Sequence, residues 1–465
     1  MKVNARFIQI VLVAASRLLC YLSRAQLGTL LPTLSLEMGL STADQGYLMS
    51  RYASGYIATQ VLGGICADRL GGYPVLAAVM LASGMICLAA PSLALLGTVP
   101  FGSAFVLLGL VQGAAFPAGN VVCARWLLPS ERALSSSLSA IGSATGTFLV
   151  SSGAPVIAER FGWQAVFLVS GVLCFAFSLV WLVLGASAPQ HCYYVSQEEL
   201  ATLEDAAILP AAASKSADLT SPKSAGKNTT PVNFQSSSKK LPPAAFFMHA
   251  SVGTLFLCHV AQNWQQCFND WLPTFYAFRL GAARDVAGFH VGAIALAELP
   301  ARAATAGLPA LLNRLGYTDL QCRKLMSLTG FLIHLLVSFA VAALLLHDGA
   351  SLLPFTVLLG CSKASAAMHA GGYFANYLDL SQNYSGILTG VGNTVATASG
   401  VFFPLFASWS LEFSRSGWLL LLASLAFMDL IAISAIPLFM SAECLDDYAA
   451  SSVCCSTQND DSKCE

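Results

Sequence analysis

Five basic side chains lie inside long apolar stretches of this sequence. They are Arg17, Arg24, Arg51, Arg302 and Lys363. A charge at the centre of a membrane span costs about 2.5–3.5 kcal/mol on insertion scales, so each retained charge indicates binding or ion pairing. Arg24 is the strongest candidate for binding, because a guanidinium can hold a carboxylate or a phosphate through two parallel hydrogen bonds. These residues favour recognition of a small anion within a membrane.

Two further cations are candidates for a second positive charge at the same site. They are Arg51 and Lys363, and for both the alternative is an ion pair inside a helical bundle. Arg51 lies five residues before Tyr56 and therefore points to a different helix face. Arg17 lies nearer the end of its span than Arg24, so we expect its long side chain to extend toward the membrane surface.

Several other polar side chains in the apolar stretches could contact a ligand or a coupling proton. Tyr56 and Gln60 are four residues apart and share a helix face, where they could bind a ligand or bond to another helix. Glu298 is a candidate coupling acid, with an ion pair to Arg302 as the alternative. His369 could titrate near neutral pH, or it could donate to a backbone carbonyl.

Two acidic residues are expected to support the structure. Asp270 lies at the end of an apolar stretch beside Trp271, where we expect it to cap a helix boundary rather than to couple transport. Asp429 is expected to bond within the bundle.

The composition indicates that membrane spans hold these residues. Of 465 residues, 56% are hydrophobic and only 10% are charged, whereas a soluble protein carries about 25% charged residues. The net charge of −1 gives no basic field to attract nucleic acid. The 14 cysteines form no C-x-x-C pair, so we expect no metal centre and no cofactor other than H⁺ or Na⁺ as a coupling ion.

The spacing of apolar windows predicts an all-α membrane protein with twelve transmembrane helices in two six-helix bundles, because one span needs about 20 apolar residues. The first six windows run from Phe7 to Leu31, Gln45 to Ala67, Tyr73 to Leu95, Phe101 to Val122, Leu134 to Ile157 and Trp163 to Leu184. The second six run from Ala244 to Phe268, Ala287 to Leu312, Leu325 to Leu346, Leu352 to Ala375, Ser385 to Trp409 and Trp418 to Met440.

A polar segment rich in Ser, Lys and Pro separates the two sets of windows. We therefore expect an N-terminal bundle at residues 1–186, a flexible cytoplasmic linker at 187–243, a C-terminal bundle at 244–440 and a cytoplasmic tail at 441–465. If both termini are cytoplasmic, fourteen of the 23 basic residues lie on the cytoplasmic side and four outside. The positive-inside rule favours this topology, and the first window is predicted to be a span rather than a cleavable signal peptide.

A glycine-rich turn follows the second window. The residues from Gly64 to Gly72 read G-x-x-x-D-R-x-G-G, which is typical of a tight turn with Asp68 and Arg69 placed at a cytoplasmic gate. This turn resembles the loop signature of the major facilitator superfamily. Residues 313–317, after the eighth window, look like a degraded second copy, as repeated halves would give.

Several segments together resemble the anion:cation symporter family, which includes vesicular glutamate, sialic acid, sodium-phosphate and plastid phosphate transporters. The resemblance implies a twelve-helix fold that moves small anions by alternating access. It also implies that Arg24, Tyr56, Gln60, Asn263 and Asn393 contact the substrate. The segments are SRAQLGTLLP, GYIATQVLGGICADRLGG, GLVQGAAFPAGNVVCARWLLPSER, RFGWQAVFLVSG, NWQQCFNDWLPTFY, CRKLMSLTGF and YSGILTGVGNT.

This chain departs from the family in its fourth span. Where relatives commonly carry an arginine and, seven residues later, a glutamate, this chain has Phe105 and Gln112. Relatives also often carry an acid next to the helix-one arginine, where this chain has Ser23. The usual proton-carrying carboxylates are therefore absent, although the Gln112 amide is still a candidate for contacting the substrate.

The favoured function is secondary active transport of a small anion, either inorganic phosphate or an organic carboxylate. The alternatives are an organophosphate or anion exchanger, and a membrane nutrient sensor that binds without transporting. An enzyme is disfavoured, since the sequence has no H-E-x-x-H, no G-x-S-x-G and no nucleotide-binding loop. The expected partners are an anionic solute and the lipid bilayer, with no nucleic acid, and the protein is expected to be a monomer.

Overall fold

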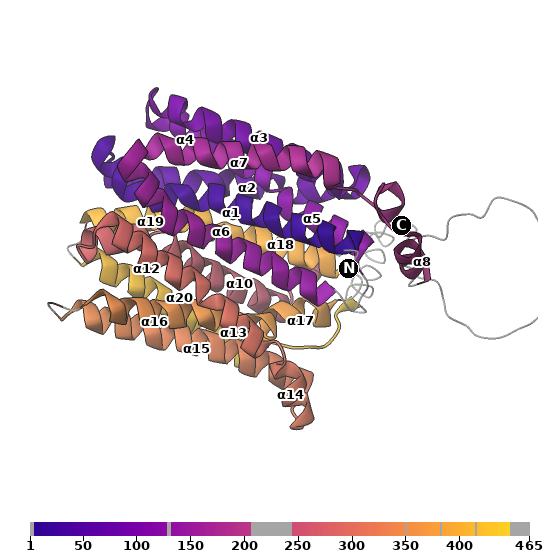
Figure 1. Ribbon diagram of the computed structural model, residues 1–465. Helices are drawn as coiled ribbons and strands as arrows, with labels where there is room; N and C mark the ends of the chain where they lie inside the picture. The colour runs from indigo at the N-terminus through magenta and orange to yellow at the C-terminus, as the bar shows by residue number, and fades with distance from the viewer. Residues whose placement is uncertain are drawn as a thin grey trace, which may run out of the picture.

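Nearly parallel helices make up the protein (Figure 1). The computed structural model describes residues 4–127, 132–205, 244–347, 349, 351–381, 384–413 and 416–446. All regular elements within these ranges are helices. Most of the predicted linker, 206–243, and most of the predicted tail, 447–465, lie outside the described residues.

The first half of the chain supplies six spans, the fourth of which is built from two consecutive helices. The helices are α1 (Ala5–Glu37), α2 (Thr42–Leu70), α3 (Gly72–Ala94), α4 (Thr98–Gln112), α5 (Ala115–Trp126), α6 (Arg132–Phe161) and α7 (Trp163–Leu184).

The second half supplies six more spans, and four of them are interrupted. The elements are α9 (Ala244–Phe247), α10 (Ala250–Asn269), α11 (Leu272–Thr274), the π-turn η3 (Phe275–Arg279), α12 (Arg284–Leu296), α13 (Glu298–Thr305), α14 (Leu308–Arg314), α15 (Asp319–Leu345), α16 (Leu352–Ser365), the 3₁₀ segment η4 (Ala366–Ala370), α17 (Tyr373–Leu380), α18 (Ser385–Thr397), α19 (Ser399–Phe413) and α20 (Gly417–Phe439).

Local sequence explains where several helices begin and end. Ser41 and Asp44 form a reciprocal capping box that starts α2, with bonds of 3.0 and 3.1 Å. Two turns need a left-handed backbone that only glycine adopts without strain: Gly71 has φ +91° after α2, and Gly316 has φ +92° after α14. These equivalent turns in the two halves fit the repeat that the sequence predicts.

Part of the predicted linker is folded. Residues 187–205 contain a 3₁₀ turn (η2, Pro189–His191) and a helix (α8, Gln197–Asp205), which the polar composition did not predict. The Glu199 carboxylate accepts the backbone N–H groups of Ala5 and Arg6, both at 2.9 Å, so α8 caps the start of α1. A helix of nine residues is too short to show a clear apolar period, so the sequence pattern did not reveal it.

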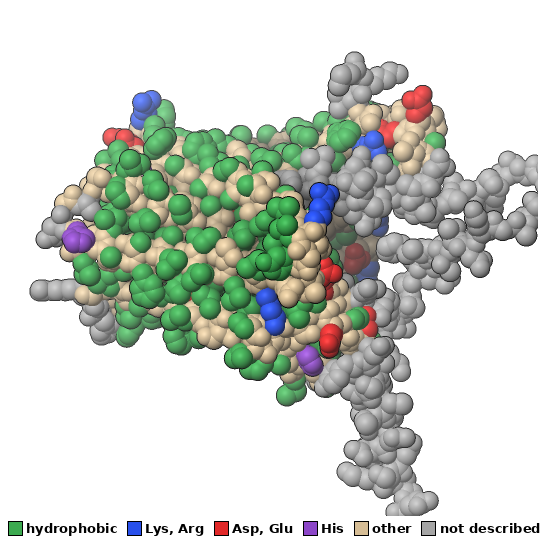
Figure 2. Space-filling model, turned by 90° about the horizontal axis from the view of Figure 1, so that it is seen from below, with side chains coloured by type: hydrophobic (Ala, Val, Ile, Leu, Met, Phe, Trp, Pro, Cys, Tyr) green, Lys and Arg blue, Asp and Glu red, His purple; other side chains and the backbone are tan. Residues whose placement is uncertain are grey.

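Nine helical stretches within the described residues are long and apolar enough to cross a membrane. Hydrophobic side chains cover much of the face seen in Figure 2, and most of its charged side chains lie toward the ends of the helices. The three spans outside these nine are α2, the span that begins with α10, and the span formed by α16, η4 and α17.

The two halves touch mainly at the end of the molecule away from the two chain termini. There α2 packs on α19, α6 packs on α12, and α1 meets α11. Glycines permit this approach: a Cβ at Gly46 would lie 2.3 Å from Ser408 Oγ, and one at Gly288 would lie 2.2 Å from the Ser151 carbonyl oxygen. The helices of the two halves are therefore pressed together at this end.

Candidate functional site

Arg24 lies half-buried in α1 and is held by aromatic rings. Its guanidinium carbon is 5.0 Å from the centroid of the Tyr52 ring and 5.7 Å from that of Tyr21. Within the described part of the chain it forms no ion pair and no hydrogen bond. Cation–π contact orients the guanidinium without using its N–H donors. All five donors therefore stay available for a ligand.

Two of the tyrosines around Arg24 come from one face of α2, and the third, Tyr21, comes from α1. Tyr52 and Tyr56 stack with their centroids 5.7 Å apart, and Tyr56 also interacts electrostatically with Arg24. The structure thus brings the predicted Tyr56 to Arg24, and it adds Tyr52 and Tyr21. Tyr52 was overlooked, although its spacing of four residues from Tyr56 places both on one helix face.

The predicted Gln60 lies where the two halves meet. Its Nε2 donates to Thr397 Oγ1 at 3.4 Å, and its Oε1 accepts from Thr394 Oγ1 at 3.3 Å. Both threonines belong to α18, so Gln60 bridges the halves. Asn393, on the same helix, has a half-buried side chain for which the described residues offer no hydrogen-bond partner.

Gln112 is engaged inside the N-terminal half rather than free for a ligand. Its amide nitrogen donates to Ser23 Oγ at 2.9 Å and to Ser83 Oγ at 3.2 Å, while its oxygen accepts from the Tyr52 hydroxyl at 3.0 Å. Both amide atoms of Gln112 are therefore bonded within the N-terminal half. The predicted contact with a substrate would have to replace one of these bonds. Two of the three departures from the family, Ser23 and Gln112, are bonded to each other, and Gln112 in turn holds the hydroxyl of Tyr52.

The second departure in the fourth span is part of an aromatic core. Phe105 is 2% exposed and packs edge-on against Phe101 and Phe167, with centroids 5.2 and 6.1 Å apart. No cation could replace it there without being buried against apolar rings.

A polar stripe runs along α10 in the C-terminal half. It comprises His259, Gln262, Asn263 and Gln266, which share one side of the helix, and it continues to Asp270 at the helix end. Asp270 ends α10 as expected, but its carboxylate also interacts electrostatically with Arg24 and with Lys363. Asp270 is therefore more than a boundary cap, and the helical spacing of the stripe was the signal for it.

Lys363 is paired within its own bundle. Its Nζ lies 3.1 Å from Glu298 Oε2 and donates to Gln266 Oε1 at 2.7 Å. Glu298 also pairs with Arg302, as the i, i+4 spacing predicts. In this state Lys363 is therefore ion-paired within the bundle, which is the alternative that the sequence left open. The Glu298 carboxylate pairs with both Lys363 and Arg302.

Arg51 is not brought to Arg24. Its guanidinium carbon lies 4.1 Å from the Tyr47 ring centroid, and its Nε donates to the Tyr47 carbonyl oxygen at 3.3 Å. The guanidinium carbon of Arg17 lies 4.5 Å from the centroid of the Phe116 ring, a cation–π contact.

Two predicted residues lie away from this region, and a third is buried within the C-terminal half. Asp68 and Arg69 are exposed at the end of α2 and form no ion pair within the described residues. His369 is fully buried in η4 and packs against Phe331 with their centroids 4.3 Å apart.

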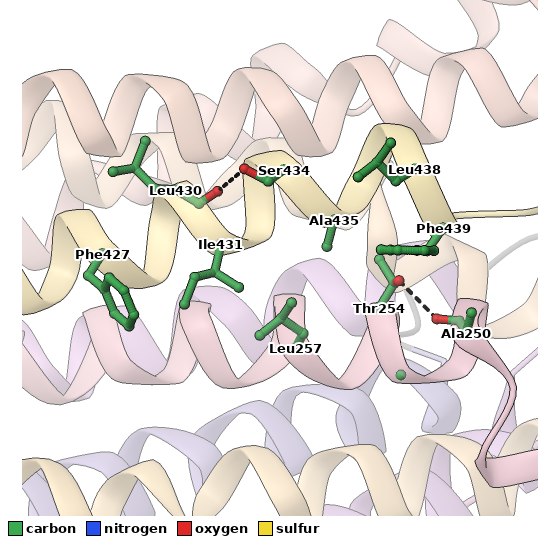
Figure 3. Close-up of a pocket in the computed structure, with 11 residues that line it drawn as sticks. Ala250, Thr254, Leu257, Phe427, Leu430, Ile431, Ser434, Ala435, Leu438 and Phe439 are labelled. Atoms are coloured by element: carbon green, nitrogen blue, oxygen red, sulfur yellow. Dashed lines mark hydrogen bonds between the residues drawn. The ribbon is translucent and has the colours of Figure 1, made fainter.

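A separate apolar pocket of about 710 Å³ opens between α10 and α20 (Figure 3). Leu257, Phe427, Ile431 and Leu438 are among its lining residues, and no charged side chain lines it. The pocket therefore does not suit an anion, and none of the predicted site residues belongs to it.

Twelve spans in two halves, holding a cation that forms no ion pair within the described residues, define a polytopic membrane transporter. The chain belongs to the Major Facilitator Superfamily, whose sequence pattern matches residues 13–404. This assignment confirms the fold class, places the chain among transporters rather than enzymes, and makes it a multi-pass membrane protein.

The relatives confirm the resemblance to anion transporters. The chain is 28% identical to a chloroplastic sodium-dependent phosphate transport protein of Arabidopsis thaliana, with 85% of this chain and 72% of the relative covered. It is 26% identical to the chloroplastic ascorbate transporter of the same plant, covering 89% and 71%. It is also 26% identical to the voltage-gated purine nucleotide uniporter SLC17A9 of Rattus norvegicus, covering 92% and 88%.

Solved structures share the fold. The D-xylose-proton symporter superimposes with a TM-score of 0.67 at 15% identity, covering 94% of this chain and 98% of the other. The xylose transporter XylE from E. coli in a partially occluded inward-open conformation gives a TM-score of 0.68 at 12% identity, covering 94% and 100%.

Proposed function

We propose that this protein is a secondary transporter of a small anion, either inorganic phosphate or an organic carboxylate, that works by alternating access. The unpaired Arg24 guanidinium carries this proposal, because a fixed charge within a span asks for a counter-ion. The names of the relatives, which include a phosphate transport protein and an ascorbate transporter, support an anionic substrate.

The substrate site uses groups from both halves. Arg24 and Tyr56 come from the first half, and Asn263, Asn393 and Lys363 come from the second. Because Asp270 and Glu298 already offset part of the positive charge, an anion must compete with these internal carboxylates for the cations. Only a small net positive charge is left over, which favours a substrate of low charge. One chain supplies the whole site, which supports a monomer as the working unit.

Alternating access follows from the contacts between the halves. We assign residues 1–186 and 244–440 to two bundles that rock about the site, with both termini in the cytosol. The close glycine contacts then seal the non-cytoplasmic end, so this state opens toward the cytosol. Asp68 and Arg69 lie on the cytoplasmic side, where the gate of the opposite state would form.

Replacing Arg24 with Ala tests the anchor. Uptake of radiolabelled phosphate and ascorbate into proteoliposomes should fall about 30-fold or more, because losing one partner of a buried charge pair costs about 2–5 kcal/mol. Arg51→Ala is the matched control, since Arg51 packs on Tyr47 and is expected to keep most of the uptake. Equal uptake by Arg24→Ala and the parent would contradict the assignment.

The same assay separates the alternatives. Uptake that needs the anion on both sides of the membrane identifies an exchanger. Binding of the anion without flux under any gradient identifies a sensor.

A further inference from the structure

A fully buried histidine in the C-terminal half has no use in the site described above. His369 lies in η4, the 3₁₀ segment that separates α16 from α17, and its side chain is 0% exposed. Neither ring nitrogen has a hydrogen-bond partner among the described residues. A buried polar group without a partner costs free energy, so its presence calls for an explanation.

The space around this imidazole is shaped for the ring. Phe331 and Tyr373 pack against it, with centroids 4.3 and 5.4 Å away. A Cβ at Gly330 would lie 2.6 Å from the ring Cε1, so α15 passes His369 closely only because it has a glycine there. These contacts hold the ring and leave both nitrogens without a bond.

A buried acid–base pair faces His369 from one side. His334, on α15, interacts electrostatically with His369. The Nδ1 of His334 lies 2.6 Å from Oδ2 of Asp429 on α20, and Oδ1 of Asp429 accepts from Gln265 Nε2 at 2.5 Å. His334 and Asp429 are 4% and 0% exposed, so this pair is closed off from water.

The Glu298 carboxylate is a second charged neighbour of His369. Glu298, on α13, also interacts electrostatically with the imidazole, and it pairs with Arg302 and with Lys363 of α16. His369 therefore interacts both with the carboxylate that holds Lys363 and with the His334 of the buried His334–Asp429 pair.

The remaining neighbours complete this titratable surrounding. On α17, Tyr373 presents its ring to His369, and Asp379 is occupied by Arg323 at 2.7 Å. Arg323 also donates to the Gly371 carbonyl oxygen at 3.1 Å, just beyond η4. Among the carboxylates of the described residues, Glu298 is thus the one whose charge acts on the imidazole.

We propose that His369 is the proton-binding group that couples transport to a proton gradient. In this state the imidazole is without a partner, whereas protonation would make both nitrogens donors that need a carboxylate. Glu298 can supply this carboxylate once Lys363 has left it to bind the substrate anion. The 3₁₀ segment η4 is the place where the span can change its winding to bring the two together.

This assignment rests on the transport function proposed above. It explains how coupling can persist although Gln112 and Ser23 stand where relatives carry acids. The coupling site has moved to the other half of the molecule, on the far side of the Lys363–Glu298 pair.

The experiment compares the parent with His369→Gln in proteoliposomes, with radiolabelled inorganic phosphate and with ascorbate as probes. Exchange at equal concentrations and equal pH should stay within about twofold of the parent. Accumulation driven by a pH gradient should fall about tenfold or more, within the usual range of coupling between two sites. His290→Gln is the matched control, because His290 is bonded to Thr356 at 2.8 Å outside this cluster.

Accumulation by His369→Gln equal to that of the parent, with an unchanged pH profile, would overturn the proposal, as would accumulation driven only by a sodium gradient. Should His369→Gln fail to fold, Gly330→Ala replaces it, because it crowds the same ring and is expected to show the same selective loss.

A measurement without substrate keeps the proposal separate from the transport function. The ¹⁵N NMR spectrum of the histidine-labelled protein contains the His369 signals, which the His369→Gln variant identifies by their absence. Protonation of this ring between about pH 5 and 8 supports the proposal even if neither probe is transported. A ring that stays neutral throughout that range contradicts it.

Discussion

An arginine kept over aromatic rings sets the chemistry of this protein. Cation–π contact stabilises the Arg24 guanidinium by about 0.5–2 kcal/mol while its N–H groups stay free. Gln112 takes part indirectly, since it holds the hydroxyl of Tyr52, whose ring lies beneath the guanidinium. The Gln112 amide, at a position where relatives commonly carry an acid, therefore serves to position Tyr52. This role does not require a titratable group.

Two substitutions of Tyr52 should separate the contribution of its ring to substrate binding from that of its hydroxyl group. Tyr52→Leu removes the aromatic face and should raise the KM for phosphate about 2- to 30-fold, which corresponds to about 0.5–2 kcal/mol. Tyr52→Phe keeps the face and should change KM much less. Uptake kinetics in proteoliposomes measure both, and equal KM values for the two variants would show that the ring does not support Arg24.

The pairing of Glu298 with two cations can be tested by a double-mutant comparison. Glu298→Gln leaves Lys363 and Arg302 without their carboxylate and should destabilise the protein by less than the ~3–5 kcal/mol that breaking a fully buried pair costs, because these side chains are part-buried. Adding Lys363→Met should recover part of this loss. The unfolding temperature in detergent reports both, and no recovery in the double variant would argue against the pair.

The helices divide into apolar spans and spans that carry the site. The three spans outside the nine apolar ones hold Tyr52 and Tyr56 on α2, the polar stripe on α10, and Lys363 and His369 around η4. A span that presents polar groups to the interior of the protein has a lower hydropathy. Its 3₁₀ or π segments change the direction in which the following side chains point. Low hydropathy in a predicted span of this protein is therefore a mark of function.

The short helix α8 ties the beginning of the linker to the first span. Glu199→Gln should weaken the cap on α1 by about 1 kcal/mol, since an amide replaces a carboxylate that accepts two backbone N–H groups. Hydrogen exchange of the first turn of α1 should become faster. Glu198→Gln is the control, because Glu198 is exposed, and an equal effect in both variants would exclude the cap.

The two halves as a whole form a molecule closed at one end. Gly288→Val would place side-chain atoms against the Ser151 carbonyl, where even a Cβ would lie only 2.2 Å from the oxygen. This change should push the halves apart at that end and reduce transport about tenfold or more, while each half stays folded.

Gly253→Val is the matched control for Gly288→Val, since a Cβ there meets nothing within 4 Å. Cysteine accessibility at that end of the molecule should rise in Gly288→Val and stay unchanged in Gly253→Val. Unaltered accessibility and transport in Gly288→Val would show that this contact does not seal the site.

The sequence by itself determined the fold class, the windows of the spans and the choice of Arg24. These depend on local properties: the length of an apolar run, the glycine that a left-handed turn requires at Gly71, and the cost of a charge inside a membrane. The repeat of the turn at Gly316 was visible for the same reason.

Only the tertiary structure decided which polar groups meet. Gln112 reaches Ser23 across 89 residues, and Lys363 reaches Gln266 across 97. Asp270 interacts with Arg24 from the other half, and the described residues leave the His369 nitrogens without a hydrogen-bond partner. Helical spacing shows which face a side chain occupies, but the packing of distant helices decides what that face contacts, and no local pattern encodes it.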